Sequence, residues 1–262
     1  MMRHFAIALS FLTLFRLPGS AQIMVTPVEL ARSLSYYPLV GLLLGACWVG
    51  VAFFLHALLP ALLLAVLLTA LMALMTRGLH LDGLADLADG AGGGYTRERR
   101  LEIMKDSSIG TFGATALILI LGLKIAALSA LVPARAWSML FLAPALSRYA
   151  MVLASYKSTY ARAEGGLGKA VCDHLSRRQL VTTTAVTVLL CLIMAPLRGG
   201  FLFLTLMACV LLVRFLSQRW LGGITGDVLV EIQSTVIPAL ENFNRGGAAG
   251  TDYPPRCVDC TE

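Results

Sequence analysis

The sequence predicts an all-α protein, a polytopic transmembrane helical bundle with about six or seven spans. Of its 262 residues, 58% are hydrophobic and only 14% are charged, and the mean hydropathy is +0.79. Apolar stretches close to the ~20 residues needed to cross a bilayer recur along the chain. These observations exclude an ordinary soluble protein. We expect one integral-membrane domain over residues 1–241, followed by a polar tail, residues 242–262, that is predicted to be disordered.

The N-terminal stretch carries Arg3 and His4 before an apolar run that ends at Phe15. A signal peptide has the same charged and apolar regions, but residues 16–22 form only a mediocre cleavage site, so a retained interfacial helix is favoured. The expected spans then follow in order, at residues 34–55, 61–75, 114–131, 137–155, 180–195 and 201–216. A further segment, residues 224–240, contains two acidic residues, and a helix lying at the membrane surface is the alternative for it.

Basic residues predict the orientation of these spans. They gather in two large loops, one with Arg77, Arg97, Arg99, Arg100 and Lys105, the other with Lys157, Arg162, Lys169, Arg177 and Arg178, whereas the alternate turns hold few. By the positive-inside rule both large loops face the cytosol of a bacterial inner membrane. The net charge of +6 is explained by this orientation and an anionic substrate. Nucleic acid is not an expected partner, because basic and aromatic residues do not interleave.

The stretch over residues 76–113 is polar in an otherwise apolar chain. On a helix, Asp82, Asp86 and Asp89 fall at i, i+4 and i+7 and share an arc of about 60°. Like charges at this spacing repel one another unless a cation lies among them, and Mg²⁺ prefers carboxylate oxygens. A solvated acidic face is the alternative. The restriction to aspartate at these positions favours a metal site held by all three residues.

The rest of this stretch also predicts a site. A glycine run over residues 90–94 indicates a flexible hinge, and Thr96 is expected to cap a short basic helix over residues 97–106. Asp106 and Ser107 then precede a new apolar span. A helix start of this kind is a natural phosphate site.

Four further features are polar residues or glycines in unusual places. Lys124 and Arg148 lie within expected spans, where charged residues usually pair or face a cavity. Arg148 is the stronger candidate for holding a phosphate, and Lys124 could equally pair or snorkel. The run 164–169 lacks the spacing of a Walker A loop, so a plain glycine-rich loop is favoured, although such a loop could close over a substrate. Asp227 could be a helix cap or a site residue.

Five motifs together resemble the cobalamin synthase family, adenosylcobinamide-GDP ribazoletransferase. They are His80–Gly90, Ile103–Ser107, Gly110–Gly113, Glu164–Gly168 and Gly222–Asp227. The similarity extends to about residue 240. The resemblance implies a multi-pass membrane enzyme that uses Mg²⁺ to join adenosylcobinamide-GDP to α-ribazole or α-ribazole 5′-phosphate, with release of GMP. The lipid bilayer is then an obligatory partner, and a homo-oligomer is an open possibility.

The resemblance also gives the polar residues expected roles. Mg²⁺ would be held by Asp82, Asp86 and Asp89. Asp106, or a carboxylate that is not engaged with metal, such as Asp89, would be the catalytic base. The substrates would contact Lys105, Ser107, Arg148, Glu164 and Asp227.

Two alternatives come from other classes of protein. The aspartate spacing is similar to that of the CDP-alcohol phosphotransferases, which carry out related chemistry. A cation or solute transporter would use the acidic cluster for conduction. Against a transporter, the carboxylates gather in and beside one loop, whereas transporters place their sites near the midplane, often between repeated halves.

Overall fold

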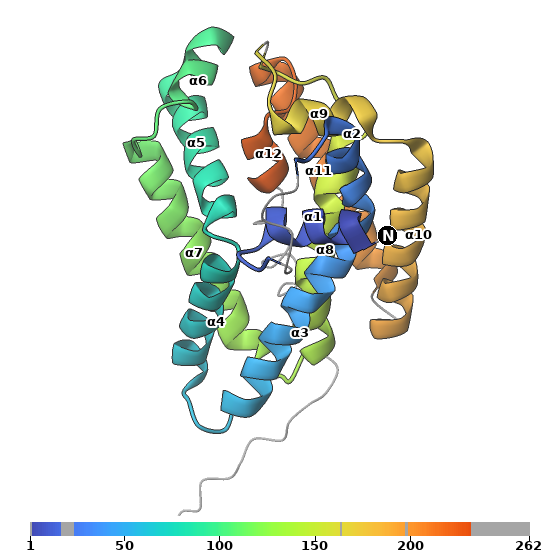
Figure 1. The fold of residues 1–262 in the computed structure, drawn as a ribbon. Helices are drawn as coiled ribbons and strands as arrows, with labels where there is room; N and C mark the ends of the chain where they lie inside the picture. Colours follow the sequence, from blue (N-terminus) through green and yellow to red (C-terminus); the bar gives the residue numbers. More distant parts are fainter. Residues whose placement is uncertain (1, 17–23, 163, 197–198, 232–262) are drawn as a thin grey trace, which may run out of the picture.

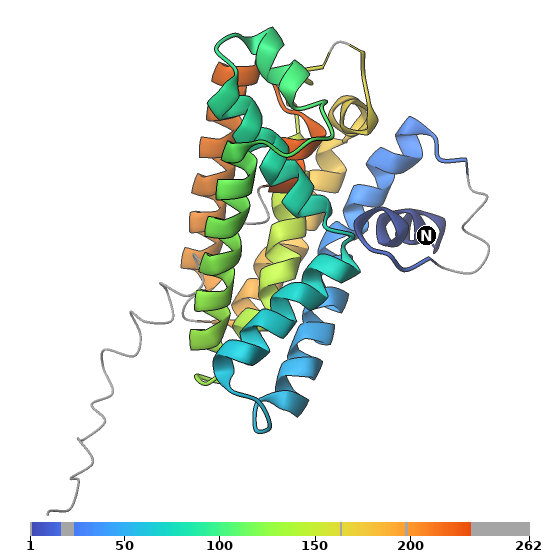
Figure 2. The same ribbon diagram turned by 90° about the vertical axis from the view of Figure 1, so that its left-hand side faces the viewer.

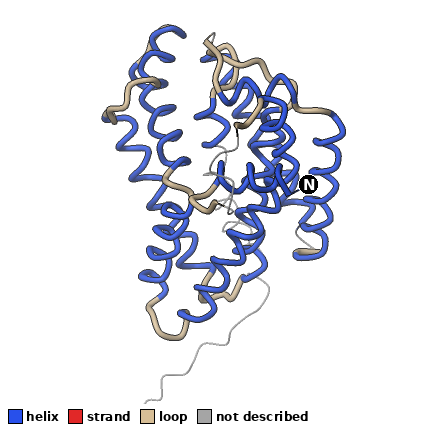
Figure 3. The backbone as a smooth tube through the Cα atoms, viewed as in Figure 1, coloured by secondary structure: helices blue, strands red, loops and turns tan. Residues whose placement is uncertain are grey.

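The structure, a computed structural model, describes residues 2–16, 24–162, 164–196 and 199–231. Within these ranges the chain is built from helices, and its one β-type pairing is an isolated bridge between Tyr160 and Ile224 (Figure 3). The all-α prediction is therefore confirmed. The predicted tail, 242–262, and most of the predicted segment 224–240 lie outside the described residues.

The bundle consists of long apolar helices that run along one axis (Figures 1 and 2). They are α3 (Tyr37–Leu55), α4 (Ala61–Met75), α7 (Thr111–Leu131), α8 (Trp137–Ser155), α10 (Arg177–Met194) and α11 (Gly199–Leu221). Within the described ranges, five helices are long and apolar enough to cross a membrane, α3 being counted together with α2 (Pro27–Ser33). The number rises to six if α4 and the helix after it form one broken span. The predicted spans up to residue 216 are thus confirmed as helices.

The broken span bends sharply where α4 meets α5 (Leu79–Gly93). The two helix axes differ by 89°, and the bend is made by Arg77 and Gly78, both left-handed with φ of 55° and 65°. Glycine adopts this conformation without penalty, whereas arginine does so rarely. The backbone N–H of Leu14 donates to the carbonyl of Met75 at 2.8 Å and ties the N-terminal segment to the bend.

Helix α8 forms the centre of the bundle, because most of its side chains are buried. Its closest neighbour is α3, where Gly41 and Gly45 are four residues apart and face the α8 backbone. A Cβ atom at Gly41 would collide with Pro144 and Ala145, and one at Gly45 with Phe141. Such a small-residue pair allows close helix packing inside a bilayer, where no hydrophobic effect drives helices together.

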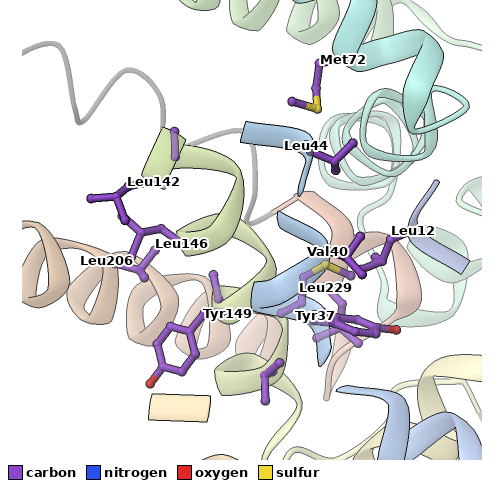
Figure 4. Close-up of a cluster of buried hydrophobic side chains, with 14 of the residues drawn as sticks. Leu12, Tyr37, Val40, Leu44, Met72, Leu142, Leu146, Tyr149, Leu206 and Leu229 are labelled. Carbon is purple, nitrogen blue, oxygen red and sulfur yellow. The ribbon is translucent and has the colours of Figure 1, made fainter. Parts of the chain in front are cut away.

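The core around α8 draws on helices from both ends of the sequence. Figure 4 shows Leu142, Leu146 and Tyr149 of α8 beside Leu206 of α11, with Leu12, Tyr37, Val40, Leu44, Met72 and Leu229 completing the labelled cluster. Deletion of a side chain from such a core leaves a cavity and costs about 2–5 kcal/mol.

The short helices gather at one end of the bundle. They are α2, α6 (Arg97–Ile103), α9 (Leu167–His174) and α12 (Gly226–Glu231), whereas α1 (Met2–Leu12) lies across the bundle axis about midway along the bundle (Figure 1). Helices α7 and α10 begin at this end, and α8 and α11 end there. Both large basic loops therefore lie on one side, as the charge pattern predicted. Helix α1 forms as predicted, and its position at the membrane interface stays a prediction.

Two local predictions in the polar stretch were wrong. The expected hinge over residues 90–94 is helical as far as Gly93, and its glycines serve packing: a Cβ at Gly90 would lie 2.6 Å from Met104 Cγ, and one at Gly92 would collide with the ring of Phe112. The expected helix 97–106 ends at Ile103. Its predicted cap is confirmed, because the Thr96 hydroxyl accepts the N–H of Arg99 at 3.3 Å.

Candidate active site

Two of the three predicted metal ligands, Asp82 and Asp86, lie one turn apart on α5, as the i, i+4 spacing requires. Asp227 at the start of α12 interacts electrostatically with both. The approach of the two helices depends on Gly83, because a Cβ there would lie 2.8 Å from the Asp227 carbonyl oxygen. The structure therefore brings together three carboxylates that are up to 145 residues apart along the chain.

Arg162 supplies the positive charge of this cluster. Its Nη2 donates to Asp227 Oδ2 at 2.7 Å and to the Met104 carbonyl at 3.2 Å, and both paired side chains are largely buried. Backbone pairing holds this arginine in place: the N–H of Ala161 donates to Ile224 at 3.0 Å, and the N–H of Ile224 donates to Thr159 at 2.8 Å. The pair thus joins the second basic loop to α12.

Burial and neighbouring charges shift the pKa of Asp227. Burial raises the pKa of this carboxyl, Arg162 and a hydrogen bond from Thr225 lower it, and the negative charge of Asp82 raises it again. The net result is a pKa above its usual range. A second cation near these acids would lower this pKa again.

A cavity of about 280 Å³ opens beside this cluster. Asp82, Asp227 and Arg162 line it together with the glycine-rich loop. In that loop Gly165 and Gly166 have φ of 86° and 141°, a region that side chains rarely enter, and α9 begins directly afterwards. The loop that sequence alone left as a plain glycine-rich segment therefore forms one wall of the candidate site.

Asp89, the third predicted metal ligand, is engaged elsewhere. It is buried, and its two carboxylate oxygens accept the backbone N–H groups of Gly110 at 2.7 Å and Gly113 at 2.8 Å. The predicted phosphate site at the start of α7 is thus occupied by the chain's own carboxylate, which satisfies the free N–H groups of a helix N-terminus. Within the described residues, no three His, Cys, Asp or Glu side chains form a ready-made metal-binding group. The ligand role of Asp89 stays a prediction.

The predicted residues Lys105, Asp106, Ser107 and Glu164 are exposed and do not line this cavity. Lys105 Nζ lies 2.6 Å from Glu164 Oε2, which lowers the pKa of that carboxyl and links the two basic loops. Asp106 Oδ1 accepts the N–H of Ser108 at 3.0 Å, and hydrogen bonds from Ser108 lower the pKa of Asp106. The roles of these four residues in binding and catalysis stay predictions.

The predicted phosphate ligand Arg148 is fully buried in α8. Its Nη1 donates to Ser147 Oγ at 3.0 Å, and its Nη2 lies 3.2 Å from Nε2 of His80 on α5. Arg148 therefore links α8 to the helix that carries Asp82 and Asp86. Lys124 is buried too, and it lines a small cavity of about 30 Å³ together with His80. A direct contact of Arg148 with phosphate stays a prediction.

Sequence reasoning missed Arg162 and Tyr160 as cavity residues. Arg162 was counted only as a basic loop residue that orients the bundle. Its position two residues before the glycine motif was the one available signal. Its partner Asp227 is 65 residues away along the chain, and no local pattern connects the two.

A family model described as cobalamin-5-phosphate synthase matches residues 4–236 of the chain. The chain belongs to the cobalamin-5-phosphate synthase family. The matched range includes every cavity residue named above, so these residues belong to the family domain.

Similar proteins carry the name adenosylcobinamide-GDP ribazoletransferase. The chain is 52% identical to one from Syntrophobacter fumaroxidans over 90% of its own length and 95% of the relative's. It is 42% identical to one from Pseudomonas savastanoi over 86% and 92% of the two chains, and 43% identical to one from Desulforamulus reducens over 84% and 87%. No solved structure matches the fold.

Proposed function

We propose that this chain is a membrane-embedded adenosylcobinamide-GDP ribazoletransferase, which joins adenosylcobinamide-GDP to α-ribazole or α-ribazole 5′-phosphate and releases GMP in cobalamin biosynthesis. The observation that carries the proposal is the family match over residues 4–236. Within that range, residues of the acidic and glycine motifs line one cavity. A CDP-alcohol phosphotransferase or a transporter would use the same carboxylates differently, but the family match favours the ribazoletransferase.

We further propose that Asp82 and Asp86 hold Mg²⁺. This ion is usually bound by one or two carboxylates together with water and substrate phosphates, so a protein cage of three ligands is not needed. The three clustered carboxylates carry more negative charge than the guanidinium of Arg162 can balance, which supports a cation site. When bound, the ion would neutralise negative charge on the diphosphate and on the departing GMP.

In the proposed reaction a ribose hydroxyl of α-ribazole attacks the phosphorus that bears cobinamide. A new bond forms between the ribose oxygen and this phosphorus, the bond from phosphorus to the bridging oxygen breaks, and GMP leaves with that oxygen. The hydroxyl proton passes to a carboxylate, for which Asp106 is the first candidate. Arg162 and Lys105 would hold phosphate oxygens through charge-assisted hydrogen bonds.

The proposed activity is tested by release of GMP from adenosylcobinamide-GDP. Purified protein in lipid vesicles should form GMP and a cobamide in equal amounts, and only when α-ribazole or its 5′-phosphate is present. Vesicles without protein are the control. Binding of adenosylcobinamide-GDP without GMP under any divalent cation would overturn the proposal, and uptake into sealed vesicles would then distinguish a transporter.

We also propose that the active-site end of the bundle faces the cytosol, because both basic loops lie there. In a cysteine-free background, Tyr95→Cys and His174→Cys should react with an impermeant thiol reagent only after cells are permeabilised. Tyr95 is 96% exposed, and His174 is exposed at the end of α9. Leu58→Cys in the turn between α3 and α4, 74% exposed, should react in intact cells. The reverse labelling pattern would contradict this orientation.

A further inference from the structure

A second cavity, of about 460 Å³, also has Asp82 in its lining. It shares Phe11, Leu79 and Asp82 with the 280 Å³ cavity. Asp82 therefore belongs to a wall that both cavities have in common. A reaction between two bound substrates needs such an arrangement, because the reacting atoms must meet at one point while the remainders of both molecules occupy separate spaces.

The two cavities differ in chemistry. The first contains the Arg162–Asp227 pair and the glycine-rich loop. The second has mostly aliphatic walls, from Leu79, Leu81, Ala85, Ile109 and Leu117, with Arg77 as the basic residue of its lining. Apolar walls with one cation suit a molecule that has a flat apolar base and a single phosphate. The first cavity, with Arg162 and the glycine-rich loop, is the better match for a diphosphate.

Arg77 differs from the other left-handed basic residues, Arg135 and Lys157, because it lines the 460 Å³ cavity. Its side chain makes no hydrogen bond or ion pair with any residue that the structure describes, whereas Arg97, Arg100 and Arg162 donate to carbonyl or carboxylate groups. Its backbone is left-handed, with φ of 55°, in the bend between α4 and α5. An unfavourable backbone conformation at a cavity wall is typical of residues whose side chain has to be presented in one direction.

We propose that the Arg77 cavity binds the attacking substrate and that Arg77 binds its 5′-phosphate, while the 280 Å³ cavity receives the diphosphate of adenosylcobinamide-GDP. This inference rests on the proposed function. The ribose oxygen forms its bond to phosphorus beside Asp82, where the cavities meet, and GMP leaves on the side of Arg162. Arg77 then makes the enzyme selective for α-ribazole 5′-phosphate over α-ribazole.

The test compares the two nucleoside substrates in the variant Arg77→Asn. Asparagine tolerates a left-handed backbone, so the bend is preserved while the cation is lost. The KM for α-ribazole 5′-phosphate should rise about 10- to 100-fold, the effect of losing hydrogen bonds between charged groups. The KM for α-ribazole and that for adenosylcobinamide-GDP should stay within about twofold, as should kcat. Arg77→Lys should restore much of the lost affinity, because it keeps the charge.

Arg135→Asn is the matched control. Arg135 is also exposed and left-handed, with φ of 49°, but it follows α7 at the other end of the bundle, so its loss should change no kinetic constant. An equal rise in KM for both nucleoside substrates, or no rise for either, would overturn the inference. So would a wild-type enzyme that accepts only α-ribazole. Absence of GMP from the wild-type protein with either substrate would instead overturn the proposed function.

Discussion

The variants Asp82→Asn and Asp86→Asn should each lower kcat/KM for adenosylcobinamide-GDP by about 10²- to 10⁴-fold. The proposed ion stabilises transition-state charge by several kcal/mol, and each 1.36 kcal/mol corresponds to a factor of ten in rate. Asparagine keeps the shape of the side chain but not its charge. The variants should therefore insert and fold like the wild type, and raised Mg²⁺ should restore part of the activity.

The measurement is a Mg²⁺ titration of GMP release, with EDTA treatment as the metal-free reference. Asp173→Asn is the control, because Asp173 is an exposed acid on α9 that lies outside both cavities. Undiminished turnover in EDTA, or a loss in Asp173→Asn as large as that in Asp82→Asn, would rule out the proposed metal site.

Asp89→Asn gives an informative contrast with these two variants. An amide oxygen can accept one of the two backbone N–H groups that Asp89 now accepts, and the other is left unsatisfied. The expected cost is about 1–3 kcal/mol of folding free energy, seen as a lower melting temperature in detergent. Loss of Mg²⁺ affinity at unchanged stability would instead show that Asp89 is a metal ligand, as the spacing alone predicts.

The second large effect is expected at Asp106. If this carboxylate accepts the proton of the attacking hydroxyl, Asp106→Asn should lower kcat by about 10²- to 10⁴-fold, the usual loss for a general base. Binding of Mg²⁺ and of adenosylcobinamide-GDP should stay nearly intact, because both precede the proton transfer. Single-turnover kinetics with separate binding measurements would resolve the two steps.

The low pKa of Asp106 gives this test a further readout. A base works in its ionised form, and hydrogen bonds from Ser108 keep the pKa of Asp106 below its usual range. Activity that depends on this group should therefore persist as the pH falls to the ordinary pKa of a free carboxyl group. If Asp106→Asn abolishes Mg²⁺ binding, Asp106 is a ligand. If kcat is unchanged, the base is to be sought among Asp89 and Asp227.

Local patterns in the sequence determined the membrane spans, the helix that carries Asp82 and Asp86, and the cap at Thr96. Each depends on spacing within a few residues or on the apolar length of one segment, which tertiary contacts do not have to supply. Charge counting likewise placed the two basic loops on one side of the bundle. The shared face of the three aspartates could also be predicted, because helix geometry alone sets the relative directions of side chains at i, i+4 and i+7.

Only the tertiary structure decided which of these groups share a site. Asp89 is on the predicted arc, but backbone N–H groups at the start of α7 donate hydrogen bonds to both of its carboxylate oxygens. Arg162 meets Asp227 across 65 residues because backbone pairing joins Ala161 to Ile224. Such contacts depend on how the helices pack and where the chain bends. The spacing of residues along the sequence predicts neither. Packing against Met104 and Phe112 also explains why the predicted glycine hinge is helical as far as Gly93. The bend between α4 and α5 places Arg77 at the wall of the second cavity.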